Sequence, residues 1–215
     1  MNKIAIYGAS GFGREVAWLI QRCRDERTVA CFIDDDTTKQ GTLLNDILVL
    51  SLQQAAEKHP DAKVVGGIGN PQIREILMKK AAVAGYAYDT VIHPGTEMSQ
   101  WIEIGPGTVI CAGNILTTNI HLGSHVQINI DCTIGHDVVL GDYTTLAPGV
   151  HVSGCVHCGC RVYIGTGAVI INGTQEEPLT IGDDAIIGAG ACVTKSIPPG
   201  QTWVGIPARP RGDNT

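Results

Sequence analysis

An apolar residue recurs every six positions from Ile92 to Ile170, and this repeat constrains the fold more than any other feature of the sequence. A helix repeats its apolar face about every 3.6 residues and a strand every two, so neither produces a period of six. A chain that repeats a short strand and a corner does produce a period of six. Each strand is then one side of a coil and directs one large side chain toward a shared axis. All fourteen positions of the series are apolar: Ile92, Met98, Ile104, Ile110, Leu116, Leu122, Ile128, Ile134, Leu140, Leu146, Val152, Cys158, Ile164 and Ile170.

Three such sides make one coil of about eighteen residues, and coils stack at the strand spacing of about 4.8 Å. The repeat therefore predicts a solenoid of parallel strands. Eleven residues separate Ile170 from Ile181 where six are expected, so the polar segment 172–178 is expected to loop out of one corner. The register resumes at Ile181, and the prolines of 198–199 end the coils.

The residues before the solenoid predict a small Rossmann-like α/β unit, because buried strands alternate with amphipathic helices. One helix follows the glycine-rich turn 8–13, and a second begins at Asn70, an N-cap residue that precedes Pro71. The strands are expected at 3–8, 29–33 and 63–68, with additional ones at 43–50 and 86–92. The expected domains are thus 1–91, an α/β domain, and 92–215, the solenoid.

Composition excludes several classes of function. The formal net charge is −6 and no basic run is present, which argues against nucleic-acid binding. No apolar run approaches the roughly 18 residues of a membrane span, and the first residues enter a strand rather than a signal peptide. We therefore expect a cytoplasmic protein whose eight cysteines are free thiols.

One group of cysteines and histidines has the composition of a zinc site: His151, Cys155, His157, Cys158 and Cys160. The repeat argues against it. Cys158 occupies an inward position of the series, whereas Cys155 and Cys160 fall on outward positions, so the three sulfurs are not expected to converge. No metal is expected.

The turn Gly8-x-x-Gly11-x-Gly13 is the first candidate binding site. Glycines at a helix N-terminus let backbone N–H groups approach phosphate oxygens. Acidic groups after the second strand, Asp34 and Asp35, are placed to bind a ribose or a base. The spacing differs from the dinucleotide fingerprint, so a tight turn that needs glycine only for packing remains an equal alternative.

The second candidate is His136, which the six-residue frame places on the outside of a corner, between the inward Ile134 and Val138. Asp137 is adjacent and can orient the imidazole. Gly154 lies eighteen residues on, one coil further along the same face. The alternative is an ordinary exposed histidine. Four other histidines are expected to be structural or solvent-exposed: His59, His93, His121 and His125. Lys195 and Arg209 are similarly expected at the surface.

The glycine turn, the solenoid and the closing segment 203–209 together resemble the hexapeptide-repeat acyltransferases, in particular the bacterial nucleotide-sugar N-acetyltransferases and the related sialic-acid O-acetyltransferases. The resemblance implies a left-handed β-helix, a homotrimer with active sites at subunit boundaries, acetyl-CoA as co-substrate and a UDP- or dTDP-linked sugar as acceptor. The substrate-binding positions that it implies are Ser10, Gly11, Phe12, Asp34, Asp35, Gly69 and Asn129. The positions that it implies for the coenzyme are Thr145, Gly165, Thr166, Gly188 and Ala189.

The resemblance also implies a mechanism. His136, oriented by Asp137, acts as general base toward the C4 amine of a 4-amino-dideoxysugar, and the N–H of Gly154 stabilises the oxyanion. The acetyl group passes directly from the coenzyme to the amine, without a metal. This chain has Thr145 where the family often has a second histidine, and Phe12 where histidine is common.

Three alternatives remain at this point. The first is O-acetylation of a sialic-acid-type sugar, which stays open because Thr145 replaces the family's second histidine. The second is a non-catalytic solenoid that binds nucleotide sugars. The third is a metal-dependent hydratase of the carbonic-anhydrase type, which needs three histidines converging across a subunit boundary.

Overall fold

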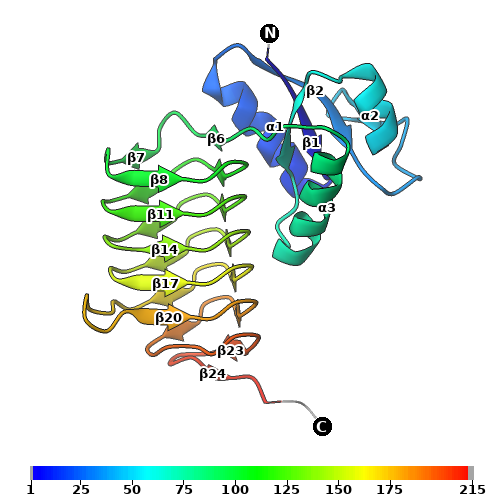
Figure 1. The fold of residues 1–215 in the computed structure, drawn as a ribbon. Coiled ribbons are helices and arrows are strands. Elements are labelled where there is room, and N and C mark those ends of the chain that lie inside the picture. The colour runs from blue at the N-terminus through cyan, green and yellow to red at the C-terminus, as the bar shows by residue number, and fades with distance from the viewer. Residues whose placement is uncertain (1, 213–215) are drawn as a thin grey trace.

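The computed structural model describes residues 2–212. An α/β part and a three-sided prism of short strands lie side by side, joined through the strand β6 (Val91–Ile92) (Figure 1). Within the described residues, the helices are all too short or too polar to cross a membrane.

The α/β part is a five-stranded sheet in the order β3-β4-β2-β1-β5. Strands β4, β2, β1 and β5 are parallel, and β3 runs antiparallel to β4. The strands are β1 (Asn2–Tyr7), β2 (Arg27–Ile33), β3 (Leu43–Leu44), β4 (Ile47–Leu50) and β5 (Lys63–Gly66), and the helices are α1 (Gly11–Cys23), α2 (Leu52–Lys58) and α3 (Pro71–Val83).

The predicted helix starts are confirmed. The side chain of Asn70 accepts a hydrogen bond from the N–H of Ile73 at 3.0 Å, and Pro71 occupies the first helical position. Helix α1 buries the face that its periodicity predicted, which includes Val16, Leu19 and Ile20. Alternation of strand and helix thus gives the layered α/β unit.

Two predictions of extent were wrong, and one helix was missed. Residues 43–50 form a hairpin rather than one strand, because Asn45 and Asp46 both adopt positive φ, as a two-residue type I′ turn requires. The expected strand 86–92 is reduced to β6 and an isolated bridge from Tyr88 to Val64. Helix α2 was not predicted, although Ser51 and Gln54 form a capping box at its start.

The prism has three faces of parallel strands, named here after the first strand of each. The β6 face has the order β24-β23-β21-β18-β15-β12-β9-β6, the β7 face β22-β19-β16-β13-β10-β7 and the β8 face β20-β17-β14-β11-β8. Only the terminal β23–β24 pair is antiparallel. Ile128 pairs with Leu146 and Leu146 with Ile164, so one coil is eighteen residues, as predicted.

The short strands take the following ranges. They are β7 (Glu97–Met98), β8 (Ile102–Ile104), β9 (Val109–Ile110), β10 (Ile115–Leu116), β11 (Ile120–Leu122), β12 (Gln127–Ile128), β13 (Thr133–Ile134), β14 (Val139–Leu140), β15 (Thr145–Leu146), β16 (His151–Val152), β17 (Val156–Cys158), β18 (Tyr163–Ile164), β19 (Val169–Ile170), β20 (Leu179–Ile181), β21 (Ile186–Ile187), β22 (Cys192–Val193), β23 (Thr202–Val204) and β24 (Arg209–Pro210).

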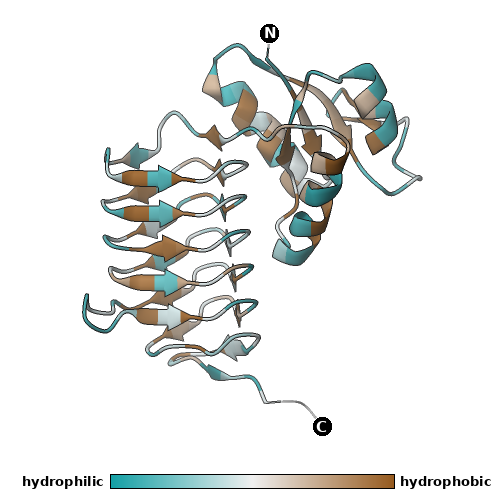
Figure 2. Cartoon of the chain, viewed as in Figure 1, coloured by the Kyte–Doolittle hydropathy of each residue, from teal (hydrophilic) through white to brown (hydrophobic). Residues whose placement is uncertain are grey.

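The six-residue series fills the axis of the prism, and its members from Ile110 to Ile170 are all buried. In Figure 2, brown segments recur at matching places from one coil of the prism to the next. Met98, in the first coil, is 38% exposed because no complete coil covers it. Cys158 points into the core as predicted.

Each corner of the prism forms an edge when the coils stack. We call them the Asn129 edge (129–132 and its equivalents 147–150 and 165–168), the His136 edge (135–138 and 153–155) and the Tyr143 edge (123–126 and 141–144). The insertion 172–178 loops out of a corner, as the interrupted register predicted, and it does so between β19 and β20, on the His136 edge. It projects on the side away from α3 (Figure 1).

Cys155 lies at an outward corner position, as predicted, yet it is only 5% exposed. The insertion is the reason. It returns to the prism beside Cys155, where the N–H of Leu179 donates to the Cys155 carbonyl at 3.1 Å. Periodicity alone places a residue on a face, but it does not reveal what a neighbouring loop covers.

Candidate active site

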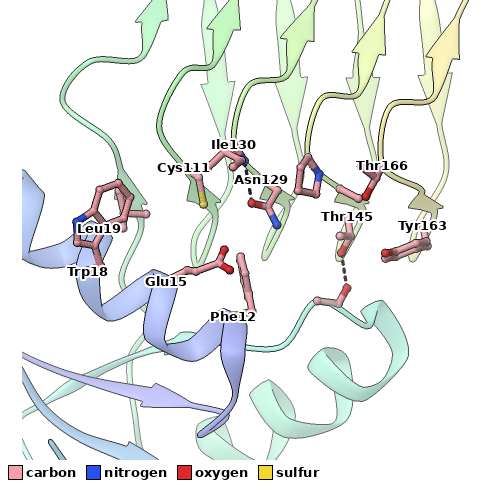
Figure 3. Close-up of a pocket in the computed structure, with 13 residues that line it drawn as sticks. Phe12, Glu15, Trp18, Leu19, Cys111, Asn129, Ile130, Thr145, Tyr163 and Thr166 are labelled. Atoms are coloured by element: carbon pink, nitrogen blue, oxygen red, sulfur yellow. Dashed lines mark hydrogen bonds between the residues drawn. The ribbon is translucent and has the colours of Figure 1, made fainter. Parts of the chain in front are cut away.

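A cavity of about 410 Å³ lies between helix α1 and the β6 face of the prism (Figure 3). Phe12 and Glu15 project into it from α1, with Trp18 and Leu19 one turn further along. These four positions are three or four residues apart, so they share one helix face. The remaining lining residues come from the α3 entry and the prism: Gly69, Cys111, Asn129, Ile130, Thr145, Ala147, Pro148, Tyr163 and Thr166.

The predicted substrate residues Phe12, Gly69 and Asn129 therefore meet in one cavity with the predicted coenzyme residues Thr145 and Thr166. Glu15 and Trp18 were not predicted. Their signal was available in the sequence, because they lie on the same face of the helix as Phe12.

Thr145 is buried and hydrogen-bonded on both sides. Its hydroxyl donates to the carbonyl of Gly69 at 2.8 Å and accepts from the guanidinium of Arg74 at 2.9 Å. In this chain Thr145 therefore ties the prism to the loop before α3. At the position where the family often has histidine, this chain therefore has a threonine that forms part of the cavity wall.

Arg74 is the centre of the contact between the two parts, and it is 1% exposed. Its guanidinium donates to side-chain oxygens of Gln127 and Thr145 and has no carboxylate partner among the described residues. Burial lowers its pKa, while the ring of oxygen acceptors favours the charged form. Its backbone acceptors are the carbonyls of Ile68, Gly69, His125, Tyr143 and Thr144.

The glycines of the turn 8–13 differ in whether packing requires them. A Cβ at Gly13 would lie 2.0 Å from the carbonyl oxygen of Gly8, and Gly8 itself has a φ of +121°, so packing requires both glycines. Gly11 is different, since a Cβ there would meet nothing within 4 Å. Gly11 and Ser10 are both exposed at the start of α1. The open part of the turn is thus the part that the resemblance assigns to substrate.

Asp34 and Asp35 lie beside this turn, and both carboxylates have partners. Asp34 accepts from the N–H of Ala9 at 2.9 Å and from the Lys39 ammonium at 3.0 Å. Asp35 accepts from the Tyr7 hydroxyl and from Lys80, each at 2.6 Å. The Asp34 carboxylate therefore holds the glycine turn in place.

His136 stands on the outside of its edge, as predicted, with 61% of its side chain exposed. Its Nδ1 lies 2.8 Å from the Asp137 carboxylate. That hydrogen bond lowers the pKa of Asp137, and contacts from Asn119 and Gln175 act in the same direction. The carboxylate is thus held ionised beside Nδ1, and Nε2 is the ring nitrogen without a hydrogen-bond partner among the described residues.

Gly154 lies directly against this ring. A Cβ at Gly154 would be 2.5 Å from Nε2 of His136. The Gly154 N–H donates no hydrogen bond within residues 2–212, although its carbonyl accepts from Gly173. A proton acceptor and an unused backbone donor therefore lie side by side, as general base catalysis with oxyanion stabilisation requires.

The cavity and His136 occupy different edges of the prism. The cavity opens at the Asn129 edge, where Thr166 and Ala189 follow one another on successive coils next to the stacked Gly165 and Gly188. His136 is on the other side of the β7 face. That face is apolar and open in part, with Ile115 43% exposed. One chain therefore contains both halves of the predicted site without joining them.

Comparison with known proteins gives a consistent result over the whole chain. Residues 3–81 match the family described as the PglD N-terminal domain, and residues 119–154 match the bacterial transferase hexapeptide family of six repeats. The GDP-perosamine N-acetyltransferase of Escherichia coli O157:H7 is 37% identical over 97% of this chain and 96% of its own length.

Two solved structures superpose closely on this one. WeeI from Acinetobacter baumannii AYE has a TM-score of 0.91 and 41% identity, and the match covers 98% of this chain and all of that one. PerB from Caulobacter crescentus, in complex with CoA and GDP-perosamine, has a TM-score of 0.87 and 28% identity over 99% and 98% of the two chains. The prism is thus a left-handed β-helix, and the chain is an acetyltransferase that belongs to the nucleotide-sugar N-acetyltransferase family of hexapeptide-repeat proteins.

Proposed function

We propose that this enzyme transfers the acetyl group of acetyl-CoA to the amine of a nucleotide-linked 4-amino-dideoxysugar. Residues 1–91 hold the nucleotide, and residues 92–215 hold the coenzyme and supply the base. A relative of the same length is a GDP-perosamine N-acetyltransferase, and a close structure contains CoA and GDP-perosamine. These relatives favour a GDP-linked sugar over the UDP- and dTDP-linked sugars expected from the sequence.

The observation that supports the proposal is the position of Gly154 against the Nε2 side of the His136 ring, because the Gly154 N–H donates no hydrogen bond within residues 2–212. This pair can remove a proton and stabilise an oxyanion in the same small volume.

The reaction that follows is direct. The sugar amine attacks the thioester carbonyl, and Nε2 of His136 accepts the proton that the amine loses. The carbonyl oxygen becomes an oxyanion that accepts a hydrogen bond from Gly154, and the C–S bond then breaks to release CoA thiolate. Positioning supplies up to about 7–11 kcal/mol and proton removal roughly 10²–10⁴-fold. No cysteine nucleophile is needed.

The division of the site between two edges supports assembly as a homotrimer. In a cyclic trimer, the His136 edge of one copy meets the Asn129 edge of the next, and each contact completes one site. The coenzyme then lies in the groove between copies, beside Thr166 and Ala189. The exposed apolar part of the β7 face, which includes Ile115 and Val169, becomes buried between them.

The experiment that tests the function is a substrate panel. Acetyl-CoA is incubated with GDP-, UDP- and dTDP-linked 4-amino sugars and with free sialic acid, and thiol release is followed. We expect release with one nucleotide-linked amine and a product whose amide is identified by NMR. Release with sialic acid alone would instead establish O-acetylation. An absence of release with every acceptor, together with tight nucleotide-sugar binding, would establish the non-catalytic alternative.

A further inference from the structure

We infer that His136, Asp137 and Cys155 form a binding site for a zinc-like divalent cation, and that its occupation inhibits the enzyme. One ligand atom from each residue lies within 4.8 Å of the other two. The inhibitory consequence rests on the proposed role of His136, but the binding itself does not. Nothing in the acetyl-transfer steps uses this cation.

The register of the β-helix brings the three residues together. Cys155 follows Asp137 by eighteen residues, so it occupies the same corner position one coil on, just as Gly154 does relative to His136. Asp137 and Cys155 also share the left-handed backbone conformation, with φ of 57° and 55°. The N–H of Cys155 donates to the carbonyl of His136 at 2.9 Å, which fixes the two coils to each other here.

The ligand set favours zinc over the hard cations. An imidazole nitrogen, a carboxylate oxygen and a thiolate sulfur are the three ligand types of zinc sites, whereas magnesium and calcium take oxygen almost alone. Three protein ligands leave a fourth position for water. The His136 side chain is 61% exposed, so its ring has room to turn and close the remaining gap.

The cluster differs from the group that the sequence drew attention to. Of those five residues only Cys155 takes part, and it does so because it is directed toward the His136 edge rather than the core. Its thiol is enclosed, so a bound cation would have one sulfur ligand shielded from solvent. The thiol would lose its proton on binding.

A cation bound here inhibits by competition. It takes a lone pair of His136 or turns the ring away from Gly154, and in both cases the base is lost.

Cobalt(II) tests the site without reference to activity. We expect one equivalent of cobalt per chain to give a thiolate-to-metal charge-transfer band with the intact enzyme. Cys155→Asn removes the sulfur while suiting the positive φ of this position. That variant should lose the band and bind zinc at least about tenfold more weakly, and acetyl transfer without zinc should be unchanged.

Cys160→Ser is the matched control, because Cys160 is a partly exposed thiol of the same segment that lies outside the cluster. It should keep both the band and the inhibition by zinc. A missing band in the intact enzyme, or equal zinc inhibition with and without Cys155, would overturn the inference. A band in a protein that shows no acetyl transfer would retain the metal site and refute the proposed function.

Discussion

The substitution Gly154→Ala tests the proposed catalytic geometry with one methyl group. The new Cβ would lie 2.5 Å from Nε2 and 2.6 Å from Cε1 of His136, where ordinary contacts are about 3.4–4 Å. The ring must therefore move by roughly 1 Å. The backbone N–H of residue 154 is retained, so the substitution displaces the base and leaves the oxyanion donor in place.

Displacement of a catalytic group by about 1 Å costs about 10²-fold in rate, or roughly 2.7 kcal/mol of transition-state stabilisation. The cost in folding should be small. Gly154 does not have a positive φ, and the neighbouring ring is exposed and free to turn. We expect a change in the free energy of unfolding within about 1 kcal/mol.

The assay is a double-mutant cycle on kcat with acetyl-CoA and the accepted sugar. Gly154→Ala should lower kcat by about 10²-fold in the presence of His136. Added to His136→Ala it should cost much less, because the ring that the methyl group displaces is gone. Equal losses in both backgrounds would refute the claim that Gly154 is required for the position of His136.

Three further predictions follow from other parts of the molecule. Arg74→Met leaves several buried carbonyls without a donor and should cost at least about 3 kcal/mol, seen as a fall in Tm of roughly 6 °C or more; an unchanged Tm would contradict the role of Arg74 at the contact. His136→Ala should lower kcat by about 10²–10⁴-fold with little change in the Kd for CoA, measured by calorimetry. The hydrogen bond from Arg161 lowers the pKa of Asp184, so its stabilisation is present above the unfolded pKa of about 3.9 and is lost as the pH falls through the lower folded value. Denaturant melts should therefore show a smaller acid-induced loss in Asp184→Asn than in the parent.

The sequence predicted the β-helix well because its signal is local and repeated. Each coil adds eighteen residues, so counting from Asp137 or His136 identifies the residue that lies one strand spacing away. The same counting predicted that the segment 172–178 loops out of a corner, and the structure places that corner on the edge that carries His136. The segment's contact with Asp137 through Gln175 could not be read from the sequence, because a loop has no period.

Contacts between the two parts of the chain were the least predictable feature. Arg74 joins acceptors from three separate segments, and nothing in its immediate sequence marks it as buried. The cavity depends on the same contact between the two parts of the chain. Its lining residues Phe12 and Asn129 are more than a hundred positions apart in the sequence, so no local pattern relates them. Cys155 shows a related difficulty: its position in the repeat was correctly counted, but its burial depends on the path of the insertion.

We expect each active site to combine the nucleotide-binding turn of one copy with His136 of the next, which can be tested by mixing subunits. His136→Ala removes the base. Gly11→Trp fills the open part of the glycine turn, where no neighbouring atom is displaced. Each variant alone should be inactive. Random trimers of both in equal amounts should recover about a quarter of the parental activity, because a quarter of the contacts pair an intact turn with an intact histidine. Mixed trimers that stay inactive would contradict the claim.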